Sequence, residues 1–403
     1  MASRVLVVVG DALPLPGYPT SGAGLRAWGL GCGLSAHGFD VSFAMLATAW
    51  RGEAVPAAFE YPVLLWHPGQ LVEVIRQARP EAVVFCHWPS VQIRQRLDVP
   101  TVIDFHGPHI LERAFQNQGE VAANALLKIE ALRKADYYVC AGEKQKSYFL
   151  AWLLISGIDV TQDRIGVVPV CLSPELPEPE PPTGAAHFVY GGVYLPWQDP
   201  TLGLITVAEV LAERGTGTLS IFGGGHPVNP IEVPPLFRTL EKQLKAHPRV
   251  RFEGIRPRDE VIEVYRRATA AVDVMVHNYE RELAFTTRTV EYLWCGLPVI
   301  YNNYAELSSL IAEYEAGWVL DPLDREGLAR IVRGILAQPE LAHERGRNAQ
   351  RLVRERLTWE RATEPLAAFL RAPRLRPSNA LDLPAQVALE LGEKDFWSRE
   401  LSV

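Results

Sequence analysis

The sequence predicts an α/β protein made of two similar units, each a parallel sheet with helices on both faces. Apolar segments of strand length alternate with helical segments, as at 82–86 and 101–105. The alternation occurs twice, on either side of the stretch SPELPEPEPPTG that starts at Ser173. Alternation of this kind indicates parallel strands joined by helical crossovers, and a proline-rich stretch of this kind is a stiff, solvated connector. At 403 residues the chain is long enough for two cores.

The domain limits follow from the position of this connector. We expect a first domain at 1–173, a linker at 174–186, a second domain at 187–366, and a tail at 367–403. The tail, above all Pro384 to Ser402, is expected to be helical and to pack back across the domain junction.

Composition excludes several classes of protein. The net charge is −7 at pH 7, so nothing indicates an electrostatic hold on nucleic acid. The five cysteines are scattered without a C-x-x-C pair, which is typical of buried thiols in a reducing compartment. The start MASRVLVVVG predicts a buried strand rather than a signal peptide, and the apolar run at 148–155 is too short to cross a bilayer. We expect a cytoplasmic protein without stable membrane insertion.

The first unit begins with a strand at Val5–Val9 and a glycine-rich loop. From Ser21 the sequence predicts a helix that ends at His37-Gly38, then a strand from Val41. Gly22 and Gly24 would let the backbone approach a ligand at the start of that helix. Many tight turns share this pattern without binding anything, so the loop alone is a weak signal.

Further strands are predicted at 82–86, 101–105 and 137–140, and an amphipathic helix at 121–134. His106 and Gly107 directly follow a strand, so they lie at the carboxyl edge of the sheet, where ligands bind in parallel sheets. A lone histidine is more often structural, but this position favours function. His87, after another strand, is a weaker candidate for the same cleft.

The second unit repeats the pattern and leads into the most informative stretch. Strands are predicted from His187, Leu219 and Val250, with helices at 201–214 and 258–268. The segment Glu280 to Ile300 then reads as loop, helix and strand after the apolar run AAVDVMV.

The helix in this stretch has two different faces. Thr286 or Thr287 can cap its start, and Gly296 and Pro298 end it. Val290, Leu293 and Trp294 fall at core spacing, while Thr287, Arg288 and Glu291 share the opposite face. A helix start after a parallel strand favours an anion, phosphate above all. The alternative is an ordinary solvated Arg288–Glu291 pair, but Glu282 brings a second acid to the same helix end.

These residues resemble the GT-B glycosyltransferases, specifically the family-four retaining enzymes that use a nucleotide-activated sugar. The resemblance covers roughly Arg4 to Leu366. Its motifs are SGAG after the first strand, VIDFHG, the strand VYGG, VRFEG, and above all EYLWCGLPV, which fits E-x-x-x-x-G-x-P-V. The segment IFGGGHP is only similar to the strand-G-x-G-P pattern of such enzymes. The resemblance implies two Rossmann-like domains that face a cleft.

The resemblance also implies roles for individual residues. Glu291 would accept hydrogen bonds from the ribose of the nucleotide, Glu282 would hold hydroxyls of the donor sugar, and His106 would sit against that sugar. The diphosphate and base would be met by a larger donor-binding set: Gly22, Gly24, Gly192, Phe285, Thr286, Thr287 and Arg288 near the diphosphate, and Gly254 and Ile255 near the base.

Two departures from the family pattern matter. Eight residues separate Glu282 from Glu291, where seven are usual, so Glu280 is the alternative first acid. Val193 and Gln198 stand where the family commonly has basic residues beside the diphosphate. We expect Arg288 and the helix start to supply the missing counter-charge, because a departing diphosphate builds negative charge.

The sequence therefore predicts a metal-independent retaining glycosyltransferase. It would need no cofactor and would move a sugar from a nucleoside diphosphate to an acceptor hydroxyl. No D-x-D pair stands where metal-dependent transferases hold a cation. The acceptor, whether a glycan, a lipid-linked glycan or a small molecule, is not identified. The alternatives are a sugar-nucleotide epimerase and a non-catalytic scaffold that binds a nucleotide sugar.

Overall fold

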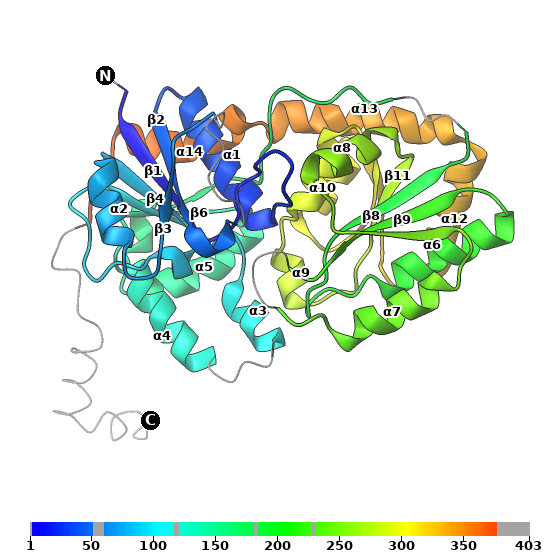
Figure 1. Cartoon of the computed structure of the whole chain (residues 1–403), viewed down its shortest axis with the longest axis horizontal. Helices are drawn as coiled ribbons and strands as arrows, with labels where there is room; N and C mark the ends of the chain where they lie inside the picture. Colours follow the sequence, from blue (N-terminus) through cyan, green and yellow to red (C-terminus); the bar gives the residue numbers. More distant parts are fainter. Residues whose placement is uncertain (1, 51–59, 117–120, 181–183, 227–230, 377–403) are drawn as a thin grey trace.

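The chain folds into two α/β domains that lie side by side (Figure 1). This computed structural model describes residues 2–50, 60–116, 121–180, 184–226 and 231–376. The first sheet has seven strands in the order β3-β2-β1-β4-β5-β6-β7, and the second has six in the order β10-β9-β8-β11-β12-β13. Every pairing within the two sheets is parallel. The predicted fold class is confirmed.

The first domain contains the first sheet and the helices around it. Its strands are β1 (Arg4–Val9), β2 (Asp40–Leu46), β3 (Val63–Trp66), β4 (Ala82–Cys86), β5 (Thr101–Asp104), β6 (Tyr137–Cys140) and β7 (Ile165–Val167). Its helices are α1 (Gly22–Ala36), α2 (Leu71–Ala78), α3 (His109–Phe115), α4 (Val121–Leu132) and α5 (Glu143–Ile155).

The second domain repeats the arrangement. Its strands are β8 (His187–Val193), β9 (Thr218–Gly224), β10 (Val250–Gly254), β11 (Ala270–Asp273), β12 (Val299–Asn302) and β13 (Gly317–Leu320). The helices that follow β8 are α6 (Thr201–Arg214), α7 (Pro235–Lys245), α8 (Arg258–Arg267), α9 (Tyr279–Leu283), α10 (Thr287–Trp294), α11 (Glu306–Glu313), α12 (Arg325–Ala337), α13 (Pro339–Arg356) and α14 (Trp359–Arg371).

Both faces of each sheet are buried, which explains why the strands read as continuous apolar runs. Along β1, Leu6 and Val8 enter one hydrophobic core, while Val5, Val7 and Val9 enter another on the opposite face. Side chains alternate between the two faces of a strand, so a strand covered on both sides needs apolar residues throughout. The arrangement leaves the carboxyl edges of both sheets for loops, and the loops carry the site.

The chain returns to the first domain earlier than the sequence predicted. Leu172 and Thr358 form a bridge, and α14 then packs on the first sheet, so the second domain ends before the expected limit at Leu366. Leu366, Ala367 and Leu370 of α14 join the core around β1. The ribbon of α14 lies with the first domain (Figure 1). The apolar face of α14 is buried against the first domain, and the sequence pattern alone does not show which domain an apolar helix face packs on. The helix expected from Pro384 to Ser402 lies outside the described residues.

No helix in the described part of the chain is long and apolar enough to cross a membrane. The apolar run at 148–155 belongs to α5, where Phe149 and Leu153 are core residues while Leu154 and Ile155 are exposed.

Candidate active site

A cleft of about 650 Å³ lies between the two domains, and residues of both line it. This volume is within the usual range for a small-molecule site, roughly 300–1,000 Å³. From the first domain the lining includes Asp11, Gly22, His87, His106, His109, Glu112 and Arg113; from the second it includes Gly192, Gln198, Arg258, Glu280, Thr287, Arg288 and Glu291.

The starts of two helices meet in this cleft. The helix α1 begins at Gly22 in the first domain, and α10 begins at Thr287 in the second. A β-carbon added to Gly22 would lie only 3.1 Å from Oγ1 of Thr287. Each helix start carries a partial positive charge and amides directed outward, so two facing starts create a place for an anion.

The local sequence explains why α10 begins and ends where it does. Thr286 stands at the capping position, but its side chain makes no capping bond; instead its hydroxyl contacts Thr289 and Tyr301. The predicted threonine cap is therefore correct in position and wrong in bonding. The uncapped first turn leaves amide donors for a ligand. At the other end, Gly296 has a φ of 72°, which confirms the predicted left-handed stop.

Arg288 occupies the region where the sequence lacks the family's usual basic residues. Its Nη1 donates to the carbonyl oxygen of Gly191 at 2.9 Å, and its Nη2 donates to Oε1 of Gln198 at 2.8 Å. Burial alone would lower the pKa of Arg288, but nearby Tyr190 and Asp273 raise it above its usual value. The guanidinium is therefore a positive charge fixed beside β8. One residue that holds it is Gln198, which occupies one of the two positions where a basic residue was expected.

Glu291, inside α10, also lines the cleft and is paired. Its Oε1 accepts a hydrogen bond of 2.7 Å from Nε of Arg258, at the start of α8. Sequence reasoning missed Arg258, because nothing local links it to Glu291, which is 33 residues further along. The pair places one cation and one carboxylate at the second-domain end of the cleft.

The structure does not place Glu282 in the cleft. The predicted loop here forms the short helix α9, which turns Glu282 toward Lys144 at 3.3 Å and His277 at 3.1 Å. Glu280, the alternative first acid, is buried in the cleft lining and is held by both Nε and Nη2 of Arg281, at 2.6 and 2.9 Å. Burial raises the pKa of Glu280, and Arg281 opposes this effect.

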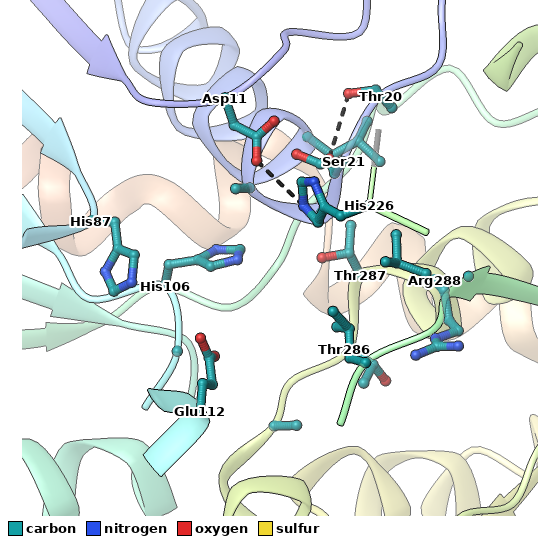
Figure 2. A pocket seen from close by; sticks show the side chains of 18 of the residues that line it. Asp11, Thr20, Ser21, His87, His106, Glu112, His226, Thr286, Thr287 and Arg288 are labelled. Carbon is teal, nitrogen blue, oxygen red and sulfur yellow. Dashed lines mark hydrogen bonds and ion pairs between the residues drawn. The ribbon is translucent and has the colours of Figure 1, made fainter. Parts of the chain in front are cut away.

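The first-domain wall of the cleft carries two histidines at neighbouring strand ends (Figure 2). His87 follows β4 and His106 follows β5, with ring centroids 6.0 Å apart. Both residues have positive φ angles, 76° and 55°, and Nδ1 of each ring is buried without a partner. Burial lowers the pKa of His106 and lowers that of His87 further below its usual value.

Below these rings, α3 adds a chain of polar groups. Nε of Arg113 donates to Nε2 of His109 at 3.2 Å, and Nδ1 of His109 lies 3.1 Å from Oε2 of Glu112. Glu112 also lines the cleft. Sequence reasoning missed Glu112 and His109; the only available signal was their position just after VIDFHG.

A contact between a histidine and an acid joins the two domains at the cleft. Nε2 of His226, after β9, lies 3.7 Å from Oδ2 of Asp11, after β1 (Figure 2). Burial raises the pKa of Asp11 and lowers that of His226. Asp11 follows a strand, so its place at the carboxyl edge could have been predicted in the same way as that of His106.

Several predicted donor-binding residues lie elsewhere. Gly24 does not line the cleft; a β-carbon there would lie 1.7 Å from the carbonyl oxygen of Ala12, so this glycine serves packing. Gly254 and Ile255 also lie outside the lining, and Arg256 and Arg258 take their place. The predicted residues that do line the cleft are Gly22, His106, Gly192, Phe285, Thr286, Thr287, Arg288 and Glu291. Within the described residues, no group of three or more His, Cys, Asp and Glu side chains is placed to hold a metal ion.

Solved structures with the same architecture define the class of fold. Sucrose-phosphate synthase from Thermosynechococcus elongatus superposes with a TM-score of 0.71 at 17% identity, covering 92% of this chain and 98% of that one. HepE from Anabaena, in complex with UDP and glucose, gives a TM-score of 0.66 at 15% identity, covering 92% and 100%. The fold is GT-B.

Sequence comparison adds a domain match and several distant relatives. Residues 201–352 match the model described as "Glycosyl transferases group 1". The D-inositol 3-phosphate glycosyltransferase of Corynebacterium efficiens is 27% identical over 188 residues, 47% of this chain and 43% of that relative. The glycogen synthase of Mycobacterium tuberculosis is 25% identical over 314 residues, 74% and 70% of the two chains. Residues 201–352, in the second domain, therefore carry the domain that this family model describes.

Proposed function

We propose that this chain is a retaining glycosyltransferase that moves a sugar from a nucleoside diphosphate to an acceptor hydroxyl without a metal ion. The observation that carries the proposal is the meeting of the starts of α1 and α10, with the buried charge of Arg288 beside them. The diphosphate would lie between these helix starts. The similar structure of Anabaena HepE contains UDP and glucose, which supports a uridine nucleotide as the first donor to test.

The second domain would hold the rest of the donor. Glu291 and Arg258 would face the ribose, and Glu280, rather than Glu282, would accept hydrogen bonds from hydroxyls of the sugar. His106 would approach the same sugar from the first domain. As the bond from the anomeric carbon to the diphosphate oxygen breaks, the helix starts and Arg288 would stabilise the developing negative charge.

Closure of the two domains would exclude water and protect the activated sugar. The acceptor oxygen would bond to the anomeric carbon from the face that the diphosphate leaves, and an oxygen of the departing diphosphate would take the acceptor proton. The cytoplasmic location and the lack of a cofactor remain predictions from the sequence.

A donor panel tests the proposal. The change in melting temperature is measured with UDP, GDP and ADP, because a ligand that binds only the folded state stabilises it. The corresponding nucleotide sugars are then assayed for slow hydrolysis. We expect one nucleotide to raise the melting temperature and its sugar conjugate to release free sugar. Isomerised donor would instead indicate an epimerase, and binding without turnover would indicate a scaffold.

A further inference from the structure

The two histidines of the first-domain wall are held in strained backbone conformations. His87 has φ 76° and ψ 139°, a region that residues other than glycine rarely adopt. His106, with φ 55°, lies at the centre of a three-residue turn closed by a bond from Gly107 N to Phe105 O. Strain of this kind costs about 1–3 kcal/mol per residue and persists mainly at functional sites. Both strained residues lie on the first-domain wall and line the cleft.

Both rings present hydrogen-bonding atoms that the described residues leave unused. Nδ1 of His87 and Nδ1 of His106 are buried and have no partner. A buried polar atom without a partner costs about 1–3 kcal/mol. A neutral imidazole has one donor and one acceptor nitrogen, and burial keeps both rings neutral by lowering their pKa values. A ligand hydroxyl suits either nitrogen because it can both donate and accept.

Glu112 is oriented by a chain of hydrogen bonds that fixes its role as an acceptor. An arginine only donates, so the contact from Arg113 to Nε2 of His109 makes that nitrogen an acceptor. The proton of a neutral His109 is then on Nδ1, which donates to Oε2 of Glu112. Oε1 of Glu112 lies 3.1 Å from the point where a β-carbon on Gly107 would sit, beside His106. A carboxylate here accepts from hydroxyls and repels anions.

The helix α3, which carries Glu112, packs against α9 of the other domain, which carries Glu280, and both acids line the cleft. The charge of Glu112 is one of the influences that raise the pKa of Glu280. The space between the two walls is bordered by these two carboxylates and by the imidazoles of the first-domain wall. The arginines that line it here, Arg113 and Arg281, already donate to His109 and Glu280. This environment favours a neutral ligand rich in hydroxyls over one that carries a phosphate or a carboxylate.

We propose that His87 and Glu112 form the acceptor subsite and select an uncharged sugar or polyol over an anionic acceptor. This inference rests on the proposed glycosyl transfer. Glu112 accepts a hydrogen bond from one hydroxyl of the acceptor and His87 binds a second, which orients the attacking hydroxyl so that its own proton points toward the departing diphosphate. The hydroxyl oxygen bonds to the anomeric carbon, the bond to the diphosphate breaks, and the proton passes to the diphosphate.

Matched small acceptors test this selectivity. Glycerol and glycerol 3-phosphate are offered at equal concentration with the nucleotide sugar that the donor panel identifies. We expect transfer to glycerol to be faster by about tenfold or more. Faster transfer to glycerol 3-phosphate would overturn the proposal, and so would hydrolysis of the donor with no transfer to glycerol.

Variants then test the two residues. Glu112→Gln and His87→Phe are each expected to lower transfer to glycerol by about 10- to 100-fold. The rise in melting temperature with nucleotide should be retained. Glu130→Gln removes an exposed carboxylate of α4 and is the matched control. If Glu112→Gln does not fold, Glu112→Asp keeps the charge and shortens its reach.

The outcomes separate this inference from the proposed function. A wild-type protein that neither binds a nucleotide nor hydrolyses its sugar conjugate would refute both. Nucleotide binding and transfer by the wild type, with undiminished transfer to glycerol by Glu112→Gln and His87→Phe, would refute the acceptor subsite alone.

Discussion

The two walls of the cleft differ in how many of their polar groups have partners. On the second-domain wall, charged groups are held by partners of the same domain: Arg288 by Gly191 and Gln198, Glu280 by Arg281, and Glu291 by Arg258. On the first-domain wall, Glu112 is held in the same way by His109, but His87 and His106 have strained backbones, and each leaves a buried nitrogen without a partner among the described residues.

The difference indicates two ways of preparing a site. Paired charges keep a fixed geometry before the ligand arrives, so a charged diphosphate meets a preorganised wall with little rearrangement. Unused nitrogens on a strained backbone gain hydrogen bonds only when a ligand arrives. The first wall thus suits a neutral molecule that both donates and accepts. Substitutions on each wall test this contrast.

The largest effect is expected for Arg288→Gln. The change removes the fixed positive charge beside the starts of α1 and α10 while keeping most of the side-chain length. We expect turnover to fall by about 100- to 1,000-fold, as for the loss of one transition-state donor. Steady-state kinetics and nucleotide affinity measure the effect. Arg330→Gln, an exposed arginine of α12, is the control. Unchanged affinity and turnover in Arg288→Gln would contradict the assignment.

Lys128→Met tests a buried charge behind the first-domain wall. Lys128 is fully buried, its Nζ has no hydrogen-bond partner, and the ring of Trp152 lies 4.1 Å away. Removing an amine from such a site should raise the free energy of unfolding by about 1–3 kcal/mol. Urea denaturation measures the change, and Lys242→Met on the exposed side of α7 is the control. A destabilised Lys128→Met would show that the amine has a partner in solution.

The stability difference between Lys128→Met and the wild type should also depend on pH. Burial lowers the pKa of Lys128 well below its usual value. Between the lowered pKa of Lys128 in the folded protein and about pH 10.4, the unfolded chain binds a proton that the folded protein does not. In this window, rising pH therefore favours the folded state. The stability advantage of Lys128→Met should be largest near neutral pH and shrink toward about pH 10. A constant advantage would exclude a titrating lysine.

Gly22→Ala tests the contact between the two helix starts. The new methyl group would lie 3.1 Å from Oγ1 of Thr287, so the two starts must move apart slightly. We expect kcat/KM to fall by about tenfold with little loss of stability, because small displacements in an active site cost rate. Gly334→Ala, where a β-carbon has nothing within 4 Å, is the control. Gly24→Ala should instead lower the melting temperature strongly, since it clashes with backbone.

The smallest effect is expected for Glu282→Gln. Its carboxylate is 38% exposed and pairs with Lys144 and His277 outside the cleft lining. Exposed ion pairs of this kind contribute about 0–1 kcal/mol, so kcat and KM should stay within about twofold of wild type. A hundredfold loss of kcat would restore Glu282 as the first acid of the pair and remove Glu280 from that role.

Local pattern explains which elements could be predicted. The strand at 82–86 and the helix at 201–214 have the predicted bounds, because apolar runs and helix-ending residues are contiguous in sequence. The different roles of the two glycines of SGAG could not be predicted from local sequence. Only the fold reveals that Gly22 faces Thr287 whereas Gly24 packs on Ala12. The two residues have the same local chemistry and different surroundings.

The sequence by itself determined the two parallel sheets, the short helix at 287–294, and the presence of Arg288, Glu291 and His106 at the carboxyl edges. These features depend on periodicity and on residues close together in the chain. Only the three-dimensional fold shows that Glu280 lines the cleft whereas Glu282 does not, and that α3 with Glu112 packs against α9 with Glu280. Those outcomes depend on the turn of α9 and on contacts between domains, which join residues far apart in sequence.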